Sequence, residues 1–526
     1  MLSNIVKKSS YYDSVTLMLV TKELKGLADI GDVSVMMGSD HNKELMRRSG
    51  LLDAGGSEAG PEDLIIAVEG KTDKAIRNSL DRLEEMLSQR SGSPERTGAA
   101  KACEAGIVKE ECNLALISVP GQYAALEAKL ALDEGLNVFL FSDNVSVEEE
   151  VFLKKYASER NLLVMGPDCG TSILNGLGLG FANSVKRGNA GIVSASGTGL
   201  QEVACLLDAR GVGISHAIGT GGRDLSGKVM GMSMLEGLRL LEEDAGTEVI
   251  VAISKPPHPE AAGRIYAASE QFRKPVVFCF FDRKSRWDKE KLRYASSDLE
   301  EAADIASGIL EAKGHKIRRD ACEGDLKKLA AEETEKMSGR QKYIHALYTG
   351  GTLCYEAVFI GLGHIPEIHS NIHLQDAALL EYAEDSIGNV YIDLGDDAFT
   401  RGRPHPMIDP EDRVARFARA AGCPDTAVIL LDFVLGRGGH DDPAGVIAEA
   451  IKKAKQAAAE EGRHLTVIAS VCGTESDSPG RSGQIEKLLA SGAVVMPSNA
   501  KAALLAAWIG EYLQEGDGSH GKKFTQ

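Results

Sequence analysis

The stretch that decides the fold is "IVSASGTGLQEVA", residues 192–204, where an apolar run rich in β-forming residues ends in small residues and a helical pattern follows. The small residues are Ser196, Gly197, Thr198 and Gly199. A strand, a turn of small residues and the start of a helix form a geometry in which free backbone N–H groups point at an anion. The stretch therefore predicts an anion-binding turn in an α/β sheet.

A second stretch repeats the pattern. In "ALYTGGTLCYEA", residues 346–357, the turn Gly350-Gly351-Thr352 precedes Glu356 by the interval that separates the first turn from Glu202. The sequence therefore predicts the same turn twice in one chain.

Composition limits the classes of protein that fit. A chain of 526 residues is long enough for three or four domains that each bury a core. The 59 Lys and Arg against 77 Asp and Glu leave a formal net charge of −18, and no dense basic block offsets it. Nucleic acid and anionic membranes are therefore poor partners.

Cysteine usage and apolar runs predict the compartment. The nine cysteines are scattered and none forms a C-x-x-C pair, which favours reduced thiols in a cytoplasm over disulfides or zinc. The N-terminal segment "MLSNIVKKSSYYDS" has no apolar core, and no apolar run approaches the length of about 18 residues that crosses a bilayer. We expect a soluble, cytoplasmic protein.

Short apolar runs alternate with amphipathic stretches along most of the chain, as in parallel sheets covered by helices. The polar stretch "SQRSGSPERTGAAKA" and a charged segment after Lys313 read as linkers. We predict a small α+β unit at 1–90, a Rossmann-like half domain at 102–187, an α/β domain at 188–312, a partly helical linker at 313–342, a further α/β domain at 343–513 and a polar tail at 514–526.

The two later α/β domains match in order as well as in style. After its turn, the first carries "HAIGTGGRDLSG", "VIVAISKPPHPEAA" and "KPVVFCFFD", and the second carries "VYIDLGDDAFTRGRPHP", "AVILLDFVLGRGGHDDPA" and "LTVIASVCGTE". Ligands of open α/β sheets bind beyond the carboxyl ends of the strands. Gly and Asp are also common in ordinary turns, but corresponding turns in the same order in two domains favour a binding function.

The candidate site residues follow from these strand ends. Backbone N–H groups and hydroxyls of glycine-rich turns can hold phosphate, and cationic side chains at strand ends can hold a carboxylate or stabilise negative charge that develops during the reaction. The candidate phosphate- or anion-binding residues are Ser196, Gly197, Thr198, Gly221, Gly222, Arg223, Gly350, Gly351, Thr352, Gly438 and Gly439. Lys255 and Arg403 are the further candidate cations.

Two histidines are candidates for proton transfer, because imidazole titrates near neutral pH. They are His405 in "GRPHPM" and His440 in "GRGGHDD"; each is equally compatible with a surface position. Cys169 lies beside Asp168, which does not favour a thiolate, so we expect a buried structural thiol. Two adjacent acids such as those in "LGDD" point apart as often as together, so the use of a metal stays open.

Several of these motifs resemble those of known protein families. "MGPDCGTSI", "GIVSASGTGLQEVA" and "IGTGGRDLSG" resemble the α subunit of succinyl-CoA synthetase, and residues 343–513 resemble the ligase domain of its β subunit. The whole arrangement, with "DSVTLMLV", "LISVPGQYA", "FSDNV", "SKPP", "LYTGGTL" and "IDLGDDAFTRGRPHPMIDP", is similar to the FdrA family of acyl-CoA-synthetase-like proteins. This resemblance implies a Rossmann-like unit that resembles a CoA-binding domain, followed by two flavodoxin-like ligase domains. The two domains would lie face to face, so that their repeated turns aim at one shared anion.

The sequence departs from succinyl-CoA synthetase where that enzyme carries phosphate on a histidine. The corresponding segment, "DRKSRWDKEKLRYASS" at 282–297, contains no histidine, so we expect no covalent phosphohistidine. The unit at 1–90 replaces the first Rossmann half with its glycine-rich CoA loop, and an ATP-grasp domain is missing. CoA binding and autonomous CoA ligation are therefore doubtful, and the cofactor stays unknown.

Three functions fit the sequence. The FdrA resemblance implies a carbamoyltransferase subunit that converts oxalurate and phosphate to oxamate and carbamoyl phosphate in anaerobic purine or allantoin degradation, with separately encoded partner subunits. The alternatives are an acyl-CoA synthetase subunit and a non-enzymatic sensor of an acyl-CoA or other metabolite. In each case the ligand is a small molecule.

Overall fold

The computed structural model describes the chain except for residues 1, 9, 11, 13, 61–62, 91–111, 282–291, 319–325, 375–376, 381–387, 401–403 and 519–526. The chain divides into two compact units. The smaller unit holds Met1–Glu111 and Asp397–Pro404, and the larger holds Cys112–Asp396 and His405–Gln526. Each unit is described by itself.

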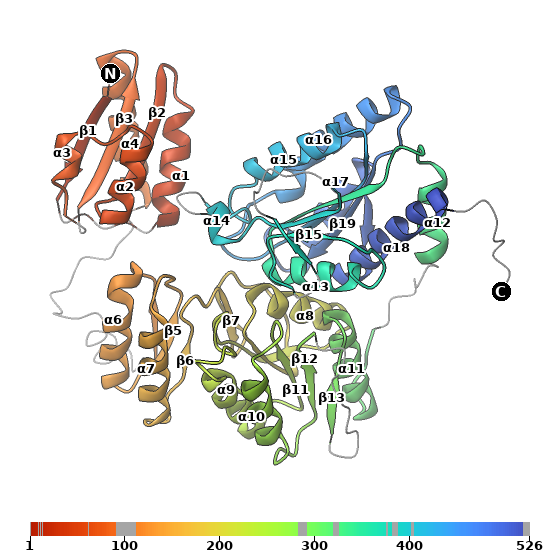
Figure 1. Cartoon of the computed structure of the whole chain (residues 1–526). Helices are drawn as coiled ribbons and strands as arrows, with labels where there is room; N and C mark the ends of the chain where they lie inside the picture. Colours follow the sequence, from red (N-terminus) through yellow and green to blue (C-terminus); the bar gives the residue numbers. More distant parts are fainter. Residues whose placement is uncertain are drawn as a thin grey trace. The chain divides into compact units, whose positions relative to one another are not determined.

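The small unit is an α+β structure around one antiparallel sheet (Figure 1). Strand β3 (Leu64–Gly70) lies in the centre and pairs antiparallel with β1 (Leu2–Lys7) and β2 (Ile30–Met37). Side chains such as Leu17, Val35 and Leu83 form its core beneath the sheet. Its helices are α1 (Ser14–Lys25), α2 (Asp40–Arg48), α3 (Ala54–Ser57) and α4 (Asp73–Arg90), and α14 (Asp397–Thr400) also falls in this unit.

The large unit begins with a Rossmann-like layer of three parallel strands in the order β4-β5-β6. The short apolar runs of the sequence form these strands, and each is followed by a turn at its carboxyl end. The elements are β4 (Leu114–Ile117), α6 (Gly121–Asp133), β5 (Asn137–Leu140), α7 (Val147–Ser158) and β6 (Val164–Met165).

The first ligase-type domain is a seven-stranded sheet in the order β13-β12-β11-β9-β10-β7-β8. Alternate residues of its buried strands face opposite sides: Ile192 packs with α8 and α11, whereas Val193 packs with α9 and α10. The strands are β7 (Thr171–Leu174), β8 (Leu177–Gly180), β9 (Arg187–Ser194), β10 (Ile214–Gly219), β11 (Val249–Ile253), β12 (Val276–Cys279) and β13 (Arg293–Ala295). The helices are α8 (Gly197–Ala209), α9 (Met232–Glu243), α10 (Pro259–Ser269) and α11 (Leu299–Ala312).

Strands β7 and β8 lie inside the range 102–187 that the sequence places in the Rossmann-like half. In the structure they extend the sheet of the following domain, because β7 pairs antiparallel with β10. Asn175 and Gly176 join them with φ of 52° and 82°, the left-handed conformations of a two-residue hairpin turn. The boundary between the two layers therefore lies before this hairpin.

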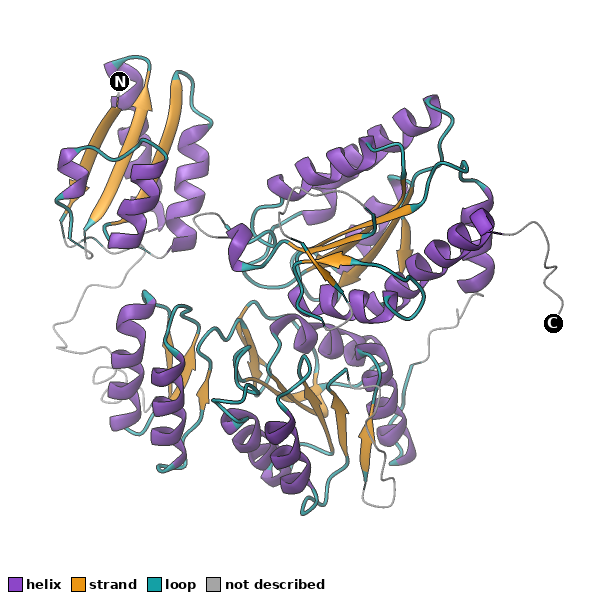
Figure 2. Ribbon diagram, in the orientation of Figure 1, coloured by secondary structure: helices purple, strands orange, loops and turns teal. Residues whose placement is uncertain are grey.

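The second ligase-type domain is a seven-stranded parallel sheet in the order β16-β15-β17-β14-β18-β19-β20. Helices cover both faces of this sheet, as Figure 2 shows. The strands are β14 (Tyr343–Tyr348), β15 (His369–Ser370), β16 (Ala378–Leu379), β17 (Val390–Asp393), β18 (Thr426–Val434), β19 (Thr466–Cys472) and β20 (Val494–Met496). The helices are α12 (Leu326–Glu335), α13 (Gly351–Gly361), α15 (Glu411–Gly422), α16 (Pro443–Glu460), α17 (Arg481–Ala490) and α18 (Asn499–Gly518).

Both ligase-type domains share the flavodoxin-like strand order. With β9 as the first strand, β10-β9-β11-β12-β13 read 2-1-3-4-5. With β14 as the first strand and the short strands β15 and β16 left out of the count, β17-β14-β18-β19-β20 read the same. In such a sheet the chain reverses direction across the sheet between the first and third strands, and ligands bind beyond the carboxyl ends there. The predicted α/β architecture is confirmed, and both repeated turns follow the first strand of their sheet.

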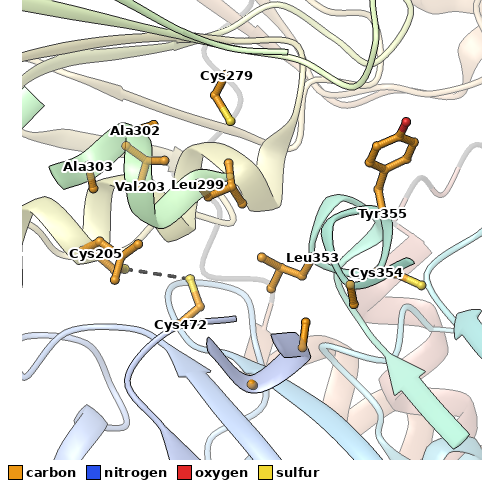
Figure 3. Close-up of a cluster of buried hydrophobic side chains, with 14 of the residues drawn as sticks. Val203, Cys205, Cys279, Leu299, Ala302, Ala303, Leu353, Cys354, Tyr355 and Cys472 are labelled. Carbon is orange, nitrogen blue, oxygen red and sulfur yellow. Dashed lines mark hydrogen bonds between the residues drawn. The ribbon is translucent and has the colours of Figure 1, made fainter. Parts of the chain in front are cut away.

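One apolar core joins the two ligase-type domains. It contains Val203 and Leu299 of the first domain together with Leu353 of the second (Figure 3). The thiols of Cys205 and Cys472, one from each domain, lie 4.0 Å apart in it. This shared core fixes the starts of α8 and α13 relative to one another.

Two predicted connecting segments contribute to the second domain. Within the predicted linker 313–342, helix α12 buries Ala330 in the shared core, and Glu333 accepts hydrogen bonds from Thr466 at 2.7 Å. Helix α18 continues past 513 to Gly518. In the part of the chain that the structure describes, no helix has both the length and the apolar character required to cross a bilayer.

Candidate functional site

The two repeated turns meet at the start of their helices. Ser196 caps α8 by accepting a hydrogen bond from Gly199 N at 2.9 Å, and its hydroxyl donates to Thr352 Oγ1 at 2.6 Å. In return, Thr352 N donates to Thr198 Oγ1 at 3.3 Å. The start of α8 in one domain is thereby joined to the start of α13 in the other.

Three backbone N–H groups remain for a ligand at this junction. Gly197, Thr198 and Gly351 are partly exposed, whereas the residues on either side of these turns are buried. Among the described residues, none accepts a hydrogen bond from these three N–H groups. Because the first N–H groups of a helix carry partial positive charge, the junction favours an anion by about 0.3 to 2 kcal/mol for each helix.

The two glycines of the second turn are required by close contacts. A Cβ at Gly350 would lie 3.1 Å from Thr198 Cγ2 and 3.1 Å from Asp432 Oδ2. A Cβ at Gly351 would lie 2.6 Å from Asp393 Oδ2 and 3.7 Å from the Lys255 amine. Thr198 of the neighbouring domain and the carboxylates of Asp432 and Asp393 occupy the space that a side chain would need. This explains why the second turn has glycine where the first has Ser196.

The buried ion pair of Asp432 and Arg413 stabilises the second turn. Asp432, on β18, accepts hydrogen bonds from Thr349 N and Gly350 N, each at 2.8 Å, and its carboxylate lies 3.1 Å from Arg413. Arg413 also donates to the carbonyl of Leu347 at 3.1 Å. Two N–H groups at the start of α13 are therefore satisfied by the protein itself, so the second turn offers fewer free donors than the first.

A second buried carboxyl lies beside this turn. Asp393 ends strand β17 and is 6% exposed; its Oδ1 accepts a hydrogen bond from Gly395 N at 2.9 Å. Burial raises the pKa of Asp393 to about 6, although the nearby Lys255 amine acts in the opposite direction. Lys255 follows β11 of the other domain and is exposed. The site therefore pairs an accessible cation with a carboxyl that titrates close to neutral pH.

His405 reaches the same place from the loop before α15. A Cβ at Gly395 would lie 2.6 Å from His405 Nε2, 2.9 Å from the carbonyl oxygen of Thr349 and 3.1 Å from Asp393 Oδ1. His405 Nδ1 accepts the N–H of Met407 at 3.2 Å, which places the hydrogen of the neutral ring on Nε2. Burial lowers the pKa of His405 to about 4. At neutral pH this histidine is therefore a neutral hydrogen-bond donor.

The two glutamates that follow the turns lock the helices in place. Glu202 of α8 accepts the N–H of Asn499, the first residue of α18, at 3.0 Å. Glu356 of α13 accepts the N–H of Leu299, the first residue of α11, at 2.8 Å. Each glutamate thus caps a helix of the other domain, and burial raises the pKa of both. The equal interval in the sequence reflects this reciprocal arrangement.

Other predicted site residues lie in different surroundings. A Cβ at Gly221 would lie 2.3 Å from the carbonyl of Pro167, and one at Gly222 would lie 4.0 Å from Asp168 Oδ2. Arg223 donates to the carbonyl of Val145 at 2.8 Å and lies 3.1 Å from the buried carboxylate of Glu150. Gly221, Gly222 and Arg223 therefore join the first ligase-type domain to the Rossmann-like layer.

The glycine-rich loop after β18 packs across the domain junction. A Cβ at Gly438 would lie 2.9 Å from the ring of Phe181, whose centroid is 6.3 Å from that of His405. A Cβ at Gly439 would lie 3.3 Å from the carbonyl of Gly436, and His440 Nδ1 accepts the N–H of Asp442 at 2.9 Å. Arg403 lies outside the described residues.

The remaining predictions concern cysteine and metal. Cys169 is 2% exposed and burial raises the pKa of its thiol to about 12, which confirms a structural thiol. The described cysteines are free thiols. Among the described residues, no group of three or more His, Cys, Asp and Glu side chains is placed to hold a metal ion.

Two flavodoxin-like domains are joined through the starts of their first helices, and residues 347–509 match the CoA-ligase family. The chain belongs to the same family as "Uncharacterized protein YahF" of Escherichia coli K12, with 42% identity over 95% of this chain and 97% of that protein. The N-terminal residues 1–103 match the family "AllF, heavy metal-associated domain".

More distant relatives are ligase subunits. The chain is 31% identical to "Malate--CoA ligase subunit alpha" of Methylorubrum extorquens over 30% of this chain and 54% of that subunit. It is also 31% identical to "Succinate--CoA ligase [ADP-forming] subunit alpha 2" of Archaeoglobus fulgidus, over 32% of this chain and 58% of that subunit. Thus the chain spans little more than half of these subunits. A dinucleotide-forming acetyl-coenzyme A synthetase 1 of Ca. Korarchaeum cryptofilum aligns with 80% of this chain and 87% of its own, at 16% identity and a TM-score of 0.30.

The name of the N-terminal family raises the question of a heavy metal. Soft metals select thiolate ligands, but the first cysteine of the chain is Cys103, at the end of the matched range, and His41 is the single histidine before it. The residues of this unit therefore do not fit a thiolate metal site.

Proposed function

We propose that the chain forms or cleaves an acyl phosphate at the junction of α8 and α13. The observation that carries this proposal is the convergence of three free N–H groups, those of Gly197, Thr198 and Gly351, from two domains. Phosphate held there lies beside the Lys255 amine, which balances its charge. In this proposal His405 Nε2 donates a hydrogen bond to the oxyanion that develops during the reaction.

The first candidate is the acyl-transferring subunit of an acyl-CoA ligase. The CoA-ligase match over 347–509 and the relatives among ligase α subunits support it. In this reaction the acyl group of the acyl phosphate passes to a thiol, so a C–S bond forms as the C–O bond to phosphate breaks. Partner subunits are part of this proposal, because these relatives are themselves α subunits of ligases.

The second candidate is carbamoyl transfer between phosphate and an amide nitrogen, with oxalurate as the substrate that the FdrA resemblance implies. One specific observation favours it: residues 282–297 contain no histidine to carry phosphate from ATP. A phosphorolytic reaction needs no such carrier, because inorganic phosphate itself attacks the carbamoyl carbon while the C–N bond breaks.

A direct assay separates the two candidates. The purified chain is incubated with carbamoyl phosphate and oxamate, and separately with acetyl phosphate and CoA, while phosphorus NMR follows the release of inorganic phosphate. Release with oxamate supports carbamoyl transfer, and release with CoA supports the ligase. Absence of release in both, together with absence of phosphate binding in calorimetry, would contradict acyl-phosphate chemistry at this site.

We expect weak CoA binding by the isolated chain. The small N-terminal unit is built on an antiparallel sheet, which differs from the parallel first half of a Rossmann domain that carries a glycine-rich loop. Calorimetry should therefore give a dissociation constant weaker than about 10 μM, or about −6.8 kcal/mol. A tighter value would show that another part of the chain holds CoA.

We also expect no phosphohistidine. His405 presents a hydrogen-bearing Nε2 rather than a lone pair to the site, because its Nδ1 accepts the N–H of Met407. Incubation with labelled ATP should leave no acid-labile label on the chain. Label at His405 would contradict both this assignment and the argument against a phosphorylated intermediate.

A further inference from the structure

Asp393 is a buried carboxyl that the fold leaves half satisfied. Two hydrogen bonds with the side chain of Asn371, each of 2.9 Å, fix the backbone of Asp393, and Oδ1 accepts the N–H of Gly395. Among the described residues, none donates a hydrogen bond to Oδ2, which lies beside Gly351 at the start of α13. Oδ2 is not one of the fully buried polar atoms without a partner, so this oxygen keeps contact with solvent. A ligand bound at the start of α13 can therefore reach it.

Both positively and negatively charged groups surround the Asp393 carboxyl. The titratable and charged groups that face it from the elements around it are Lys255, Cys354, Asp396, His405 and Asp432. Lys255 favours the ionised carboxylate, whereas Asp396 and Asp432 oppose it. An anion bound at the N–H of Gly351 would add a further negative charge next to Oδ2, and this favours the protonated carboxyl.

We propose that Asp393 is the acid–base residue of this site, and that it takes up a proton when an anion binds at the junction of α8 and α13. This inference rests on the proposed function. In acyl transfer from an amide, an unprotonated oxygen of hydrogen phosphate forms the bond to the carbonyl carbon, the C–N bond breaks, and Asp393, which is protonated in the anion complex, gives its proton to the leaving nitrogen. The hydrogen that the phosphate carried then passes to Asp393 and restores its proton, so no net proton is consumed.

Transfer to a thiol uses the same residue. Asp393 gives its proton to the departing phosphate as the C–O bond breaks, and the proton of the thiol replaces it as the C–S bond forms. His405 stays neutral in both reactions and donates from Nε2. The division of roles follows from the bond of Met407 to Nδ1, which leaves His405 without a free lone pair.

Sulfate is the probe that tests this inference, because its own charge does not change near neutral pH. Calorimetric titrations of the full chain with sulfate, in buffers of different ionisation enthalpy, measure the protons taken up on binding. We expect uptake of most of one proton at pH 7, and an affinity that falls about tenfold for each pH unit above about pH 6.

Matched variants assign the proton to a residue. Asp393→Asn should bind sulfate without proton uptake and without this pH dependence, whereas His405→Gln and the exposed control Asp441→Asn should keep the uptake. Asp393→Asn should also melt at a higher temperature than the wild type at pH 7.5 and lose this advantage near pH 4. The reason is that a carboxyl with a raised pKa destabilises the fold above that pKa.

The outcomes distinguish failure of the inference from failure of the proposed function. If neither sulfate nor phosphate binds the wild type, the anion site itself is wrong. If sulfate binds the wild type with no proton uptake, or Asp393→Asn retains the uptake, Asp393 is not the acid–base residue. If Asp393→Asn does not fold, the pH dependence of sulfate binding by the wild type still tests the inference. Loss of the proton uptake in His405→Gln would then assign the proton to His405 and contradict the role of Asp393.

Discussion

Replacement of Gly351 by valine is expected to weaken phosphate binding at least about 100-fold, which corresponds to about 2.7 kcal/mol. A Cβ at this position would lie 2.6 Å from Asp393 Oδ2, closer than real Cβ atoms approach. The branched side chain would also cover the N–H that α13 offers to the anion. Calorimetric titration with phosphate measures the loss, and a melting curve reports whether the variant is folded.

The control for this substitution is Gly483→Val in the same domain. Gly483 lies on the exposed side of α17, and a Cβ there would meet nothing within 4 Å. This variant should bind phosphate as the wild type does. If Gly351→Val is folded and binds phosphate normally, the second turn is a structural repeat without a share in the anion site.

Replacement of Asp432 by alanine is expected to destabilise the second ligase-type domain by about 3 to 5 kcal/mol. The substitution leaves the buried guanidinium of Arg413 unpaired and removes the acceptor of Thr349 N and Gly350 N. For a domain of this size the melting temperature should fall by about 6 to 20 °C. Differential scanning calorimetry of the full chain measures this change.

Two further variants serve as controls for Asp432→Ala. Asp441→Ala changes an exposed aspartate in the same domain and should leave the melting temperature within about 2 °C of the wild type. Asp432→Asn keeps one acceptor for the turn and should give an intermediate loss. A wild-type melting temperature for Asp432→Ala would contradict the view that this ion pair supports the turn.

The α/β fold was predictable because its strands are apolar runs that end in glycine and aspartate. The predicted turn at Gly197 follows β9, and the predicted turn at Gly351 follows β14. The hairpin after Cys169 escaped prediction although "LNGL" has the Asn-Gly pair of a two-residue turn. Its strands are only four residues long, and the sequence does not indicate which sheet they extend.

The site was predictable in its backbone but less so in its side chains. Asp393 and Asp432 sit inside apolar runs, "VYIDL" and "AVILLDFV", and a polar residue in a buried strand is the signal that could have singled them out. Their roles depend on contacts with Gly351 and Gly350, which arise only when strands distant in the sequence become neighbours. For the same reason the reciprocal caps of Glu202 and Glu356 required the structure.

The central claim is that one anion is shared between the helix starts of two domains, and selective NMR observation of backbone amides tests it most directly. In chain labelled with nitrogen-15 glycine, the amide resonances of Gly197 and Gly351 are followed as phosphate is added, with Gly483 as a reference. We predict that Gly197 and Gly351 shift together, with a single dissociation constant, while Gly483 stays unchanged. A shift of Gly197 alone, or two different dissociation constants, would contradict a shared site.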